Sequence, residues 1–387
     1  MHRRTFVRML CLGGLATLSA PVVTFGQVRQ PGRFVFVLLR GGVDGLAAVV
    51  PYGDPEYAAT RGALALDAQD LVPLDDTFAL APGLASLREL WEADELAVLH
   101  ALAIPYRTRS HFDGQAVLET GLDRPAGAAD GWLNRVLQVL EGQRSAIAIA
   151  AGVPRSLVGP HDVQTWSPAQ LGVVDEGYLA RLAVLYRADT ALATRFDLAL
   201  RQESLVGEET AARGNAAAGA TTALFEATAR ILTQDGAPNI AALEFSGWDT
   251  HANQGVGDGA LDRRLAQLAE GLLAFRTAMA DTWAGTTVVV MTEFGRTARP
   301  NGTRGTDHGT AGAGFVLGST LARAAVLADW PGLSATALFE GRDLRPTLDT
   351  RTVLRAALAG TFDMTDAQLD RVFPGTTGRR DALALMR

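Results

Sequence analysis

The stretch Thr286–Gly309, TTVVVMTEFGRTARPNGTRGTDHG, contains the pattern that decides the fold. It opens with an uninterrupted β-branched and apolar run, which is typical of a strand buried on both faces of a sheet. The run ends at Glu293, and a loop rich in glycine and arginine then leads to Asp307 and His308. Open α/β sheets bind their ligands at the carboxyl ends of their strands. The stretch therefore predicts a buried strand with a functional site at its end.

Similar short runs recur along the chain and predict six strands: Phe34–Leu39, Leu96–Leu102, Ala146–Ala151, Ile240–Phe245, Thr286–Met291 and Phe315–Leu317. Stretches with the apolar spacing of a helix lie between them, and Leu261–Thr282 is the clearest. This alternation predicts an α/β fold, a doubly wound and mainly parallel sheet with helices on both faces. A mostly helical segment at about 160–235 interrupts the alternation, so we expect a helical insertion there, with a loop at 203–219.

The N-terminal residues predict export. Arg3 and Arg4 precede a short apolar run without charge, which is the pattern of a secretory signal. The arginine pair followed by Phe6 resembles a twin-arginine signal. We expect residues 1–26 to be this signal and 27–387 to form a single domain in the periplasm or outside the cell. A membrane anchor is the alternative, but the run is short and only mildly apolar compared with the ~20 residues that a span needs.

The composition is that of a globular chain, with 48% hydrophobic and 20% charged residues and a formal net charge of −7. An acidic chain without a basic run argues against nucleic-acid binding. We find no further segment that is apolar enough to cross a membrane once the signal is removed. The single cysteine, Cys11, lies within the predicted signal, so we expect no disulfide in the mature chain.

Polar side chains follow several of the predicted strands. Asp44 follows the first, Ser110 the second, and Asp249 and His251 the fourth, while Glu293 follows the fifth. Because the carboxyl ends of parallel strands meet at one edge of a sheet, we expect these side chains to lie close together. Carboxylate and imidazole groups are ligands of Zn²⁺ and Mn²⁺, so the pattern predicts a metal site at this edge.

Each candidate also has a structural alternative. Asp44 lies between glycines and is compatible with a tight turn, and Asp249 and His251 are compatible with a helix cap and a surface histidine. Glu293 has a weaker alternative, because a carboxylate at the end of a buried strand must be paired, hydrated or bound to a metal. Asp307 beside His308 is compatible with an acidic residue that orients a histidine ligand.

Ser110 begins the sequence SHFD, which resembles a capping box with Ser110 as the helix N-cap. A hydroxyl at a helix N-terminus near a metal is equally suited to act as a nucleophile. The arginines near these loops are candidates for binding an oxyanion, and a solvated surface position is their alternative: Arg107, Arg109, Arg296, Arg299 and Arg304. His111 is compatible with either a ligand or the start of the helix.

Five loops together resemble the exported bacterial family called domain of unknown function 1501: RGGVDG, RSHFDGQAVLETG, GWDTHANQG, TEFGRTARPNGTRGTDHG and GRDLRPTLDTR. That family is similar to a remote branch of the alkaline phosphatase and sulfatase superfamily. The resemblance implies one or two divalent metals at the carboxyl edge of the sheet. It also implies a serine, threonine or modified cysteine that attacks phosphorus or sulfur.

The resemblance gives each residue a role. Asp44 matches the metal-bridging aspartate, Ser110 stands in the place of the nucleophile, and Asp249 with His251 matches a further ligand pair. Glu293 stands where Asp-His-Gly usually follows a strand, so one histidine ligand is replaced. The resemblance then makes His308 the last histidine ligand, with Asp307 beside it: the implied metal ligands are Asp44, Asp249, His251, Glu293, Asp307 and His308.

These observations predict a metal-dependent hydrolase of phosphate or sulfate esters, with Ser110 and Arg296 as catalytic residues. The expected cofactor is a divalent metal, Zn²⁺, Mn²⁺, Mg²⁺ or Ca²⁺, and the expected partner is a small-molecule or polymeric ester. The alternative is a metal-binding or assembly protein of the cell envelope that does not catalyse a reaction. A processing enzyme that acts on another leaving group is a third reading.

Overall fold

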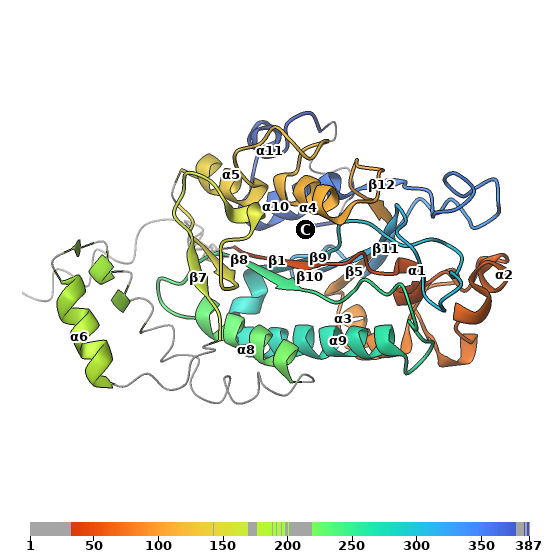
Figure 1. Cartoon of the computed structure of the whole chain (residues 1–387), viewed down its shortest axis with the longest axis horizontal. Helices are drawn as coiled ribbons and strands as arrows, with labels where there is room; N and C mark the ends of the chain where they lie inside the picture. Colours follow the sequence, from red (N-terminus) through yellow and green to blue (C-terminus); the bar gives the residue numbers. More distant parts are fainter. Residues whose placement is uncertain are drawn as a thin grey trace, which may run out of the picture.

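The computed structural model describes residues 32–141, 143–168, 176–187, 189–190, 192–194, 196–197, 200, 219–376, 383 and 385–386. The predicted signal, Cys11 and nearly all of the predicted loop at 203–219 lie outside the described residues. In the part of the chain that the structure describes, helices cover both faces of one large sheet (Figure 1). No helix among these residues has the length and apolar character needed to cross a membrane.

The large sheet has the strand order β11-β5-β10-β9-β1-β8-β6-β7, and β12 pairs with β5. Only β10 among these strands runs antiparallel to its neighbours, β5 and β9, so the predicted mainly parallel sheet is confirmed. The strands are β1 Arg33–Leu39, β5 Leu96–Ala103, β6 Ala146–Ile149, β7 Gln164–Trp166, β8 Ile240–Phe245, β9 Thr286–Met291, β10 Gly312–Leu317, β11 Ala325–Leu327 and β12 Leu348–Asp349.

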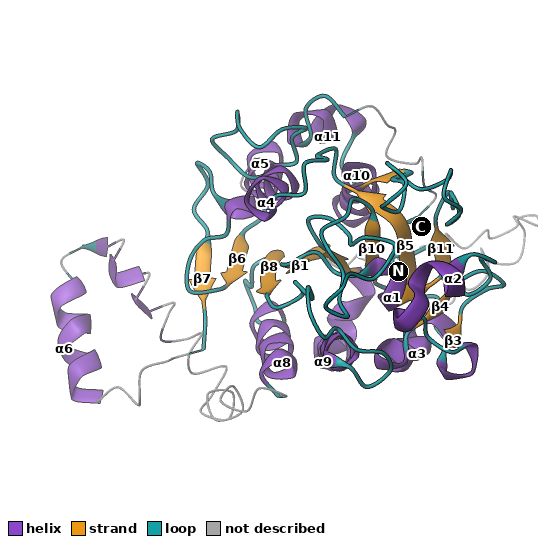
Figure 2. Ribbon diagram, turned by 45° about the vertical axis from the view of Figure 1, so that its right-hand side comes forward, coloured by secondary structure: helices purple, strands orange, loops and turns teal. Residues whose placement is uncertain are grey.

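Two layers of helices cover the sheet (Figures 1 and 2). One layer holds α3 Arg88–Glu92, α8 Ala220–Leu232 and α9 Ala260–Met279, and the other holds α4 His111–Thr120, α5 Trp132–Val139, α10 Thr350–Phe362 and α11 Asp366–Val372. Helices α1 Gly45–Ala48, α2 Tyr57–Arg61 and α6 Glu176–Tyr186 are also among the described elements. A second sheet holds β2 Val49–Val50, β3 Val72–Pro73 and β4 Ala79–Leu80. Short 3₁₀ helices cover 62–64, 68–70, 82–87, 155–157 and 280–285.

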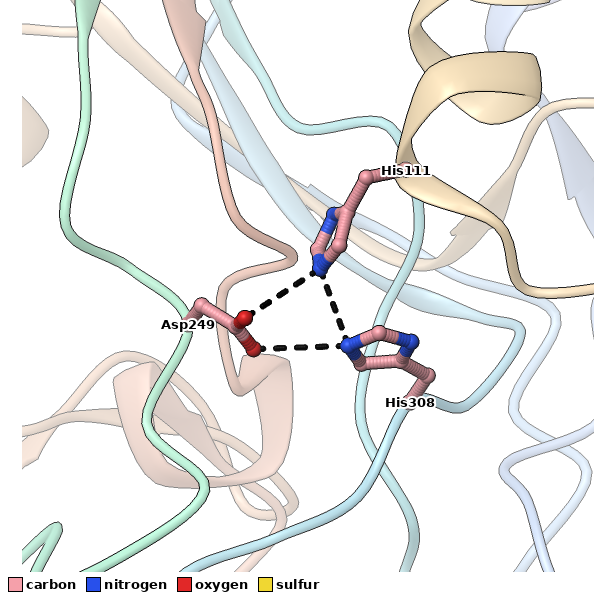
Figure 3. A group of neighbouring side chains, drawn as sticks. All are labelled: His111, Asp249 and His308. Carbon is pink, nitrogen blue, oxygen red and sulfur yellow. Dashed lines mark hydrogen bonds and ion pairs between the residues drawn. The ribbon is translucent and has the colours of Figure 1, made fainter.

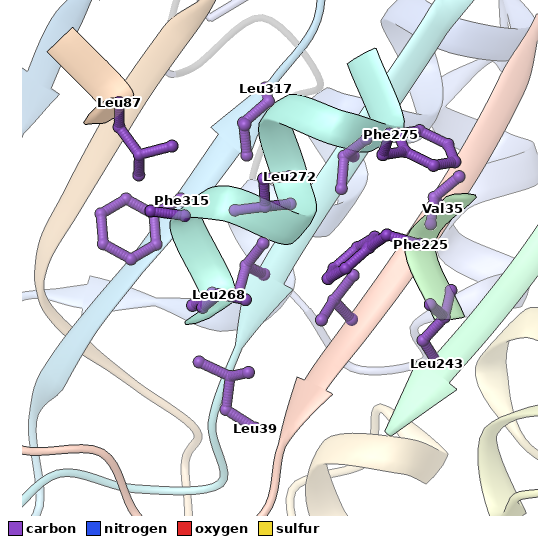
Figure 4. Close-up of a cluster of buried hydrophobic side chains, with 14 of the residues drawn as sticks. Val35, Leu39, Leu87, Phe225, Leu243, Leu268, Leu272, Phe275, Phe315 and Leu317 are labelled. Carbon is purple, nitrogen blue, oxygen red and sulfur yellow. The ribbon is translucent and has the colours of Figure 1, made fainter. Parts of the chain in front are cut away.

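Strand β1 is apolar at successive positions because both of its faces are buried. Val35 and Val37 belong to the core that includes Leu268 and Leu272 of α9 (Figure 4). Phe36 on the opposite face packs edge-on against Trp132 of α5, with ring centroids 5.1 Å apart. All six predicted strands are present, as expected for apolar runs buried on both faces.

The segment predicted as an insertion contributes one strand near its start and one helix near its end to the layers of the fold. Strand β7 pairs with β6 at the end of the sheet, and α8 packs along α9 beneath it (Figure 1). Helix α6 also belongs to this segment. The described ends of the segment therefore extend the α/β layers.

Strand direction brings the motif loops to one edge of the sheet. Strands β1, β5, β8 and β9 are parallel, so the loops that follow them leave from the same edge. Strand β10 is antiparallel and starts at that edge, so the loop that precedes it also lies there. The edge therefore collects the loops that begin after Leu39, Ala103, Phe245 and Met291.

His100 on β5 is fully buried and both of its ring nitrogens are satisfied. Nδ1 accepts a hydrogen bond from the Ala101 N–H at 2.7 Å, and Nε2 donates to the Val49 carbonyl at 2.9 Å. This pattern requires a neutral imidazole with the proton on Nε2. Burial lowers the pKa of His100 to about 4.

We expect the neutral form of His100 to make stability dependent on pH. Between pH 6.5 and about 4 the unfolded chain binds a proton that the folded chain does not, so stability falls as the pH decreases. In urea unfolding, the stability advantage of the wild type over His100→Gln should shrink by about 3 kcal/mol between pH 7.5 and pH 4. An advantage that is constant over this range would contradict the assignment.

Candidate metal centre

Three imidazoles from separate segments converge at the carboxyl edge of the sheet. His111 is the first residue of α4, His251 lies after β8, and His308 lies before β10. The Nε2 atom of His308 is 2.9 Å from Nε2 of His111 and 2.9 Å from Nε2 of His251. We call these three residues, with Asp249, the histidine cluster.

Asp249 completes the histidine cluster. Its Oδ1 lies 3.1 Å from Nε2 of His251 and 3.4 Å from Nε2 of His308. Its Oδ2 lies 3.4 Å from Nε2 of His111. Figure 3 shows that His111, Asp249 and His308 point toward one another, and one ligand atom of each lies within 4.8 Å of the others. Nitrogen and oxygen atoms at such distances are typical of a metal site.

The outer nitrogen of each imidazole faces an acceptor. Nδ1 of His111 lies 2.7 Å from Oε1 of Glu293. Nδ1 of His251 lies 3.3 Å from Oδ1 of Asp307. Nδ1 of His308 lies 2.9 Å from the carbonyl oxygen of Arg109. Arg109 has φ 65°, a left-handed conformation uncommon for a non-glycine residue. A carboxylate or carbonyl partner on the outer nitrogen is the usual way in which proteins orient histidine ligands.

These partners fix the position of the imidazole protons. A carbonyl oxygen only accepts, so Nδ1 of His308 carries a proton. A hydrogen bond from Asn301 lowers the pKa of Asp307, and Glu293 also has a lowered pKa, so both carboxylates are ionised acceptors. In the neutral imidazoles, therefore, all three Nε2 lone pairs face the centre of the cluster, which is the orientation that metal ligands require.

Glu293 is fully buried at the end of β9. Burial alone would raise the pKa of its carboxyl group, but hydrogen bonds from His111 and from Gln115, at 3.0 Å, lower the pKa below its usual value. The Gly41 N–H also donates to its Oε1 at 2.9 Å. A Cβ atom at Gly41 would come within 2.6 Å of the Asp249 nitrogen, and φ there is +126°, so the contact requires glycine.

Arg40 and two carboxylates hold Gln115 in place. Arg40 donates from Nη1 to Oε1 of Gln115 at 2.6 Å. Its Nε and Nη2 bind the two oxygens of Glu244 at 2.8 and 2.7 Å, and Nη2 also binds Glu119 at 2.8 Å. Burial opposes the charge of Arg40, but these carboxylates raise its pKa above the ordinary value. Arg40 therefore positions Gln115, Gln115 positions Glu293, and Glu293 in turn orients His111.

Arg296 positions Asp249. Its side chain is fully buried, and Nη2 donates to Oδ1 of Asp249 at 2.5 Å. Burial would raise the pKa of Asp249, but the Arg296 guanidinium lowers it below the usual value. The sequence predicted Arg296 as a catalytic clamp for an oxyanion, whereas the structure places it behind a carboxylate of the cluster.

The loop after β9 folds back on itself. The Thr297 N–H donates to the Asp307 carbonyl at 2.9 Å, and the Gly309 N–H donates to the Gly295 carbonyl at 2.8 Å. The fold-back sets Arg296 opposite His308 in a β-bridge. One continuous loop therefore supplies Glu293, Arg296, Asp307 and His308 to the site.

The Asp44 carboxylate is bound by side chains that do not belong to the histidine cluster. Its Oδ2 accepts hydrogen bonds from Nη2 of Arg61 at 2.5 Å and from Nε2 of Gln254 at 2.7 Å. Both members of the Asp44–Arg61 ion pair are almost completely buried. The sequence predicted Asp44 as a metal ligand, but its carboxylate is held by a guanidinium from α2.

The other predicted residues fall into two groups. Asp249, His251 and His308 meet at the centre of the cluster. Glu293 and Asp307 were also predicted as ligands, but they contact the outer nitrogens of His111 and His251. The inner nitrogens of these two imidazoles point to the centre of the cluster. Each of these two carboxylates therefore lies behind an imidazole and not at the centre, where a metal ligand was predicted.

Ser110 is the N-cap residue of α4 and directly precedes His111. Its side chain makes no capping hydrogen bond, unlike the capping box that was one alternative for this residue. Asp113, the expected partner of that box, instead accepts a hydrogen bond from the Tyr106 hydroxyl at 2.8 Å. The Ser110 hydroxyl is thus not required as a cap.

The sequence alone does not assign two contributors to the site, His111 and Asn301. Its pattern is compatible with His111 as either a ligand or the start of a helix. Asn301 donates from Nδ2 to the His251 carbonyl at 2.8 Å and to Oδ1 of Asp307 at 3.0 Å. A histidine that follows Ser110 at the end of a strand loop was the available signal for His111, whereas nothing in the sequence pointed to Asn301.

The chain was compared with known proteins. The family model described as "Protein of unknown function (DUF1501)" matches residues 91–373, which is more than half of the chain. A search of curated protein sequences found no match.

Solved structures give only distant likenesses. A phosphonate monoester hydrolase of Agrobacterium radiobacter is 12% identical with TM-score 0.35, covering 74% of this chain and 68% of its own. The C-terminal periplasmic domain of EcEptC from Escherichia coli, in complex with Zn, is 11% identical with TM-score 0.33, covering 74% and 73%. Phosphonoacetate hydrolase from Sinorhizobium meliloti 1021 is 13% identical with TM-score 0.31, covering 69% and 56%.

Proposed function

The chain belongs to the DUF1501 family, whose description names no activity, and we propose that this member is a metal-dependent hydrolase of phosphate or sulfate esters. The proposal rests on one observation, the convergence of three imidazole Nε2 atoms and one carboxylate at the carboxyl edge of the sheet. Every outer nitrogen of these imidazoles has an acceptor, so the inner nitrogens are free to bind a metal.

The donor set suits zinc best among the expected metals. His111, His251, His308 and Asp249 would hold the ion, and imidazole-rich sites with one carboxylate are typical of Zn²⁺. Mg²⁺ and Ca²⁺ prefer sites built from oxygen ligands. When bound, the metal would act as a Lewis acid toward an ester oxygen.

The chain's own groups would bind and orient the ester. Ser110 lies at the N-terminus of α4, next to His111, where its hydroxyl is a candidate nucleophile. The N–H groups at the start of this helix favour a phosphate or sulfate oxygen. Arg296 would keep Asp249 ionised and oriented, and would not itself contact the ester.

The proposed function is tested by metal analysis and an ester screen on the same protein. The purified protein should bind close to one zinc ion per chain, measured by elemental analysis after dialysis. It should then hydrolyse 4-nitrophenyl phosphate, bis(4-nitrophenyl) phosphate or 4-nitrophenyl sulfate in a reaction that a chelator stops. Metal binding without turnover of any of these esters would favour the non-catalytic alternative, and absence of metal would refute both.

A serine variant tests the nucleophile separately. If Ser110 attacks the ester, Ser110→Ala should lower kcat by at least about 100-fold while zinc content is retained, because no ligand is removed. Unchanged kcat in Ser110→Ala would remove Ser110 from the mechanism and would leave a water molecule as the nucleophile.

We also propose that the protein is exported by the twin-arginine route, which rests on the sequence of residues 1–26 alone. Replacing Arg3 and Arg4 by lysine should retain the protein in the cytoplasm on cell fractionation. Export that persists in this variant would contradict the assignment.

A further inference from the structure

A cavity lies beside the histidine cluster. It is open, has a volume of about 210 Å³, and is lined by Thr297, Arg299, Pro300, Asp307, Gly341 and Arg342. Asp307 belongs to both regions, because its Oδ1 faces Nδ1 of His251 at 3.3 Å while the residue also lines the cavity wall. The cavity therefore borders the histidine cluster through Asp307.

Two guanidinium groups are held on the cavity wall by backbone carbonyls. Arg299 donates from Nη1 to the Gly341 carbonyl at 3.2 Å. Arg342 donates from Nη1 to the His308 carbonyl at 2.9 Å and to Oδ1 of Asp343 at 2.8 Å. Among the residues that the structure describes, Nε and Nη2 of these two arginines have no hydrogen-bond partner, so each retains donors for a ligand.

The carboxylates near the cavity are engaged by neighbouring groups, except that Oδ2 of Asp307 has no hydrogen-bond partner among the described residues. Asp307 accepts at Oδ1 from Nδ2 of Asn301 at 3.0 Å and faces His251 with the same oxygen. Asp343 is fully buried and accepts at Oδ1 from Arg342 and at Oδ2 from Nε of Arg109, at 2.8 Å each. The cavity therefore presents more unused donors than unused acceptors.

We propose that this cavity binds a second anionic group of the substrate, a carboxylate, sulfate or phosphate that is carried beside the scissile ester. The inference deepens the proposed hydrolase function and rests on it for the identity of the scissile group. Guanidinium groups recognise planar and tetrahedral oxyanions through paired N–H donors. The substrate class that follows is an ester with at least two acidic groups.

Binding of inorganic sulfate to protein treated with a chelator tests the cavity without the metal. Arg299→Gln/Arg342→Gln should weaken sulfate binding at least about 10-fold in calorimetry, because charge-assisted hydrogen bonds are lost. Arg88→Gln, which removes one positive charge from an exposed pair with Glu92, should bind sulfate like the wild type. Equal sulfate affinity in the double variant and Arg88→Gln, or no sulfate binding by the wild type, would overturn the proposal.

A second variant separates the cavity from the histidine cluster. Arg342 also contacts the His308 carbonyl, so Arg299→Gln, whose only described side-chain bond is to the Gly341 carbonyl, serves as the milder change. Melting temperature and zinc content are measured in the same samples. Weakened sulfate binding in Arg299→Gln with wild-type melting temperature supports the cavity, and wild-type sulfate affinity in this variant overturns a role for Arg299.

Ester kinetics distinguish failure of this inference from failure of the proposed function. The preference for 2-carboxy-4-nitrophenyl phosphate over 4-nitrophenyl phosphate, expressed as the ratio of kcat/KM values, should fall at least about 10-fold in the double variant. The same ratio in the wild type and the double variant would overturn the second anion site and leave the hydrolase function standing. If neither of these esters is hydrolysed, and bis(4-nitrophenyl) phosphate and 4-nitrophenyl sulfate are not hydrolysed either, the proposed function fails, and sulfate binding alone decides the role of the cavity.

Discussion

Replacing His308 by alanine is expected to lower the affinity for zinc by more than about 100-fold. Its Nε2 is the atom that lies 2.9 Å from both other imidazole Nε2 atoms, so its loss opens the centre of the cluster. Removing a partner behind a ligand already costs about 10–100-fold in metal affinity, and removing a ligand costs more. Titration of the metal-free protein with zinc, against a competing chelator, measures the change.

Two matched variants make this result specific. His161→Ala removes a histidine outside the cluster, in the loop after the 3₁₀ turn at 155–157, and should leave zinc affinity unchanged. Glu293→Gln keeps the shape of the side chain but removes the charge behind His111, so a loss of about 10–100-fold is expected. Equal zinc affinity in His308→Ala and His161→Ala would exclude the histidine cluster as the metal centre.

Replacing Arg61 by methionine is expected to destabilise the fold by about 3–5 kcal/mol, because it leaves the Asp44 carboxylate buried without a counter-charge. Arg61 is fully buried and also donates to the Ala298 carbonyl at 3.1 Å. The loss should appear in the urea unfolding of the wild type and Arg61→Met at pH 7.

The partner substitution identifies the cause and tests the role of Asp44. Adding Asp44→Asn to Arg61→Met removes the unpaired charge and should restore part of the stability, which a double-mutant cycle measures. Asp44→Asn alone should keep the zinc affinity of the folded protein. A loss of more than about 100-fold in this single variant would instead restore Asp44 as a metal ligand, as the sequence predicted.

The fold was predictable from the sequence to the extent that buried strands are visible as apolar runs. Strand β9 is buried at every position, and its boundaries match the predicted run. The reversed direction of β10 was not predictable from its apolar residues, because a buried run has the same composition in either direction. That reversal explains why His308, which precedes a strand, lies with residues that follow strands.

The residue types of the site were predictable, but their distance from its centre was not. The end of β9 directed attention to Glu293, yet the sequence does not show that the His111 imidazole stands in front of it. The Asp307–His308 pair is compatible with an acidic residue behind a histidine ligand, but the histidine that Asp307 contacts is His251. Asp44 follows β1 as a ligand would, and only the fold reveals that Arg61 from α2 holds it. A side chain's partner across the fold depends on packing that no local pattern records.

The histidine cluster draws its members from distant parts of the chain, and His111 and His308 are 197 residues apart in sequence. Its loops meet only after β8, β9 and β10 have joined the sheet, so a chain that ends before His308 lacks part of the cluster. In the proposed hydrolase, metal uptake would therefore follow formation of the sheet, and a bound ion would stabilise the completed fold over every partly folded state.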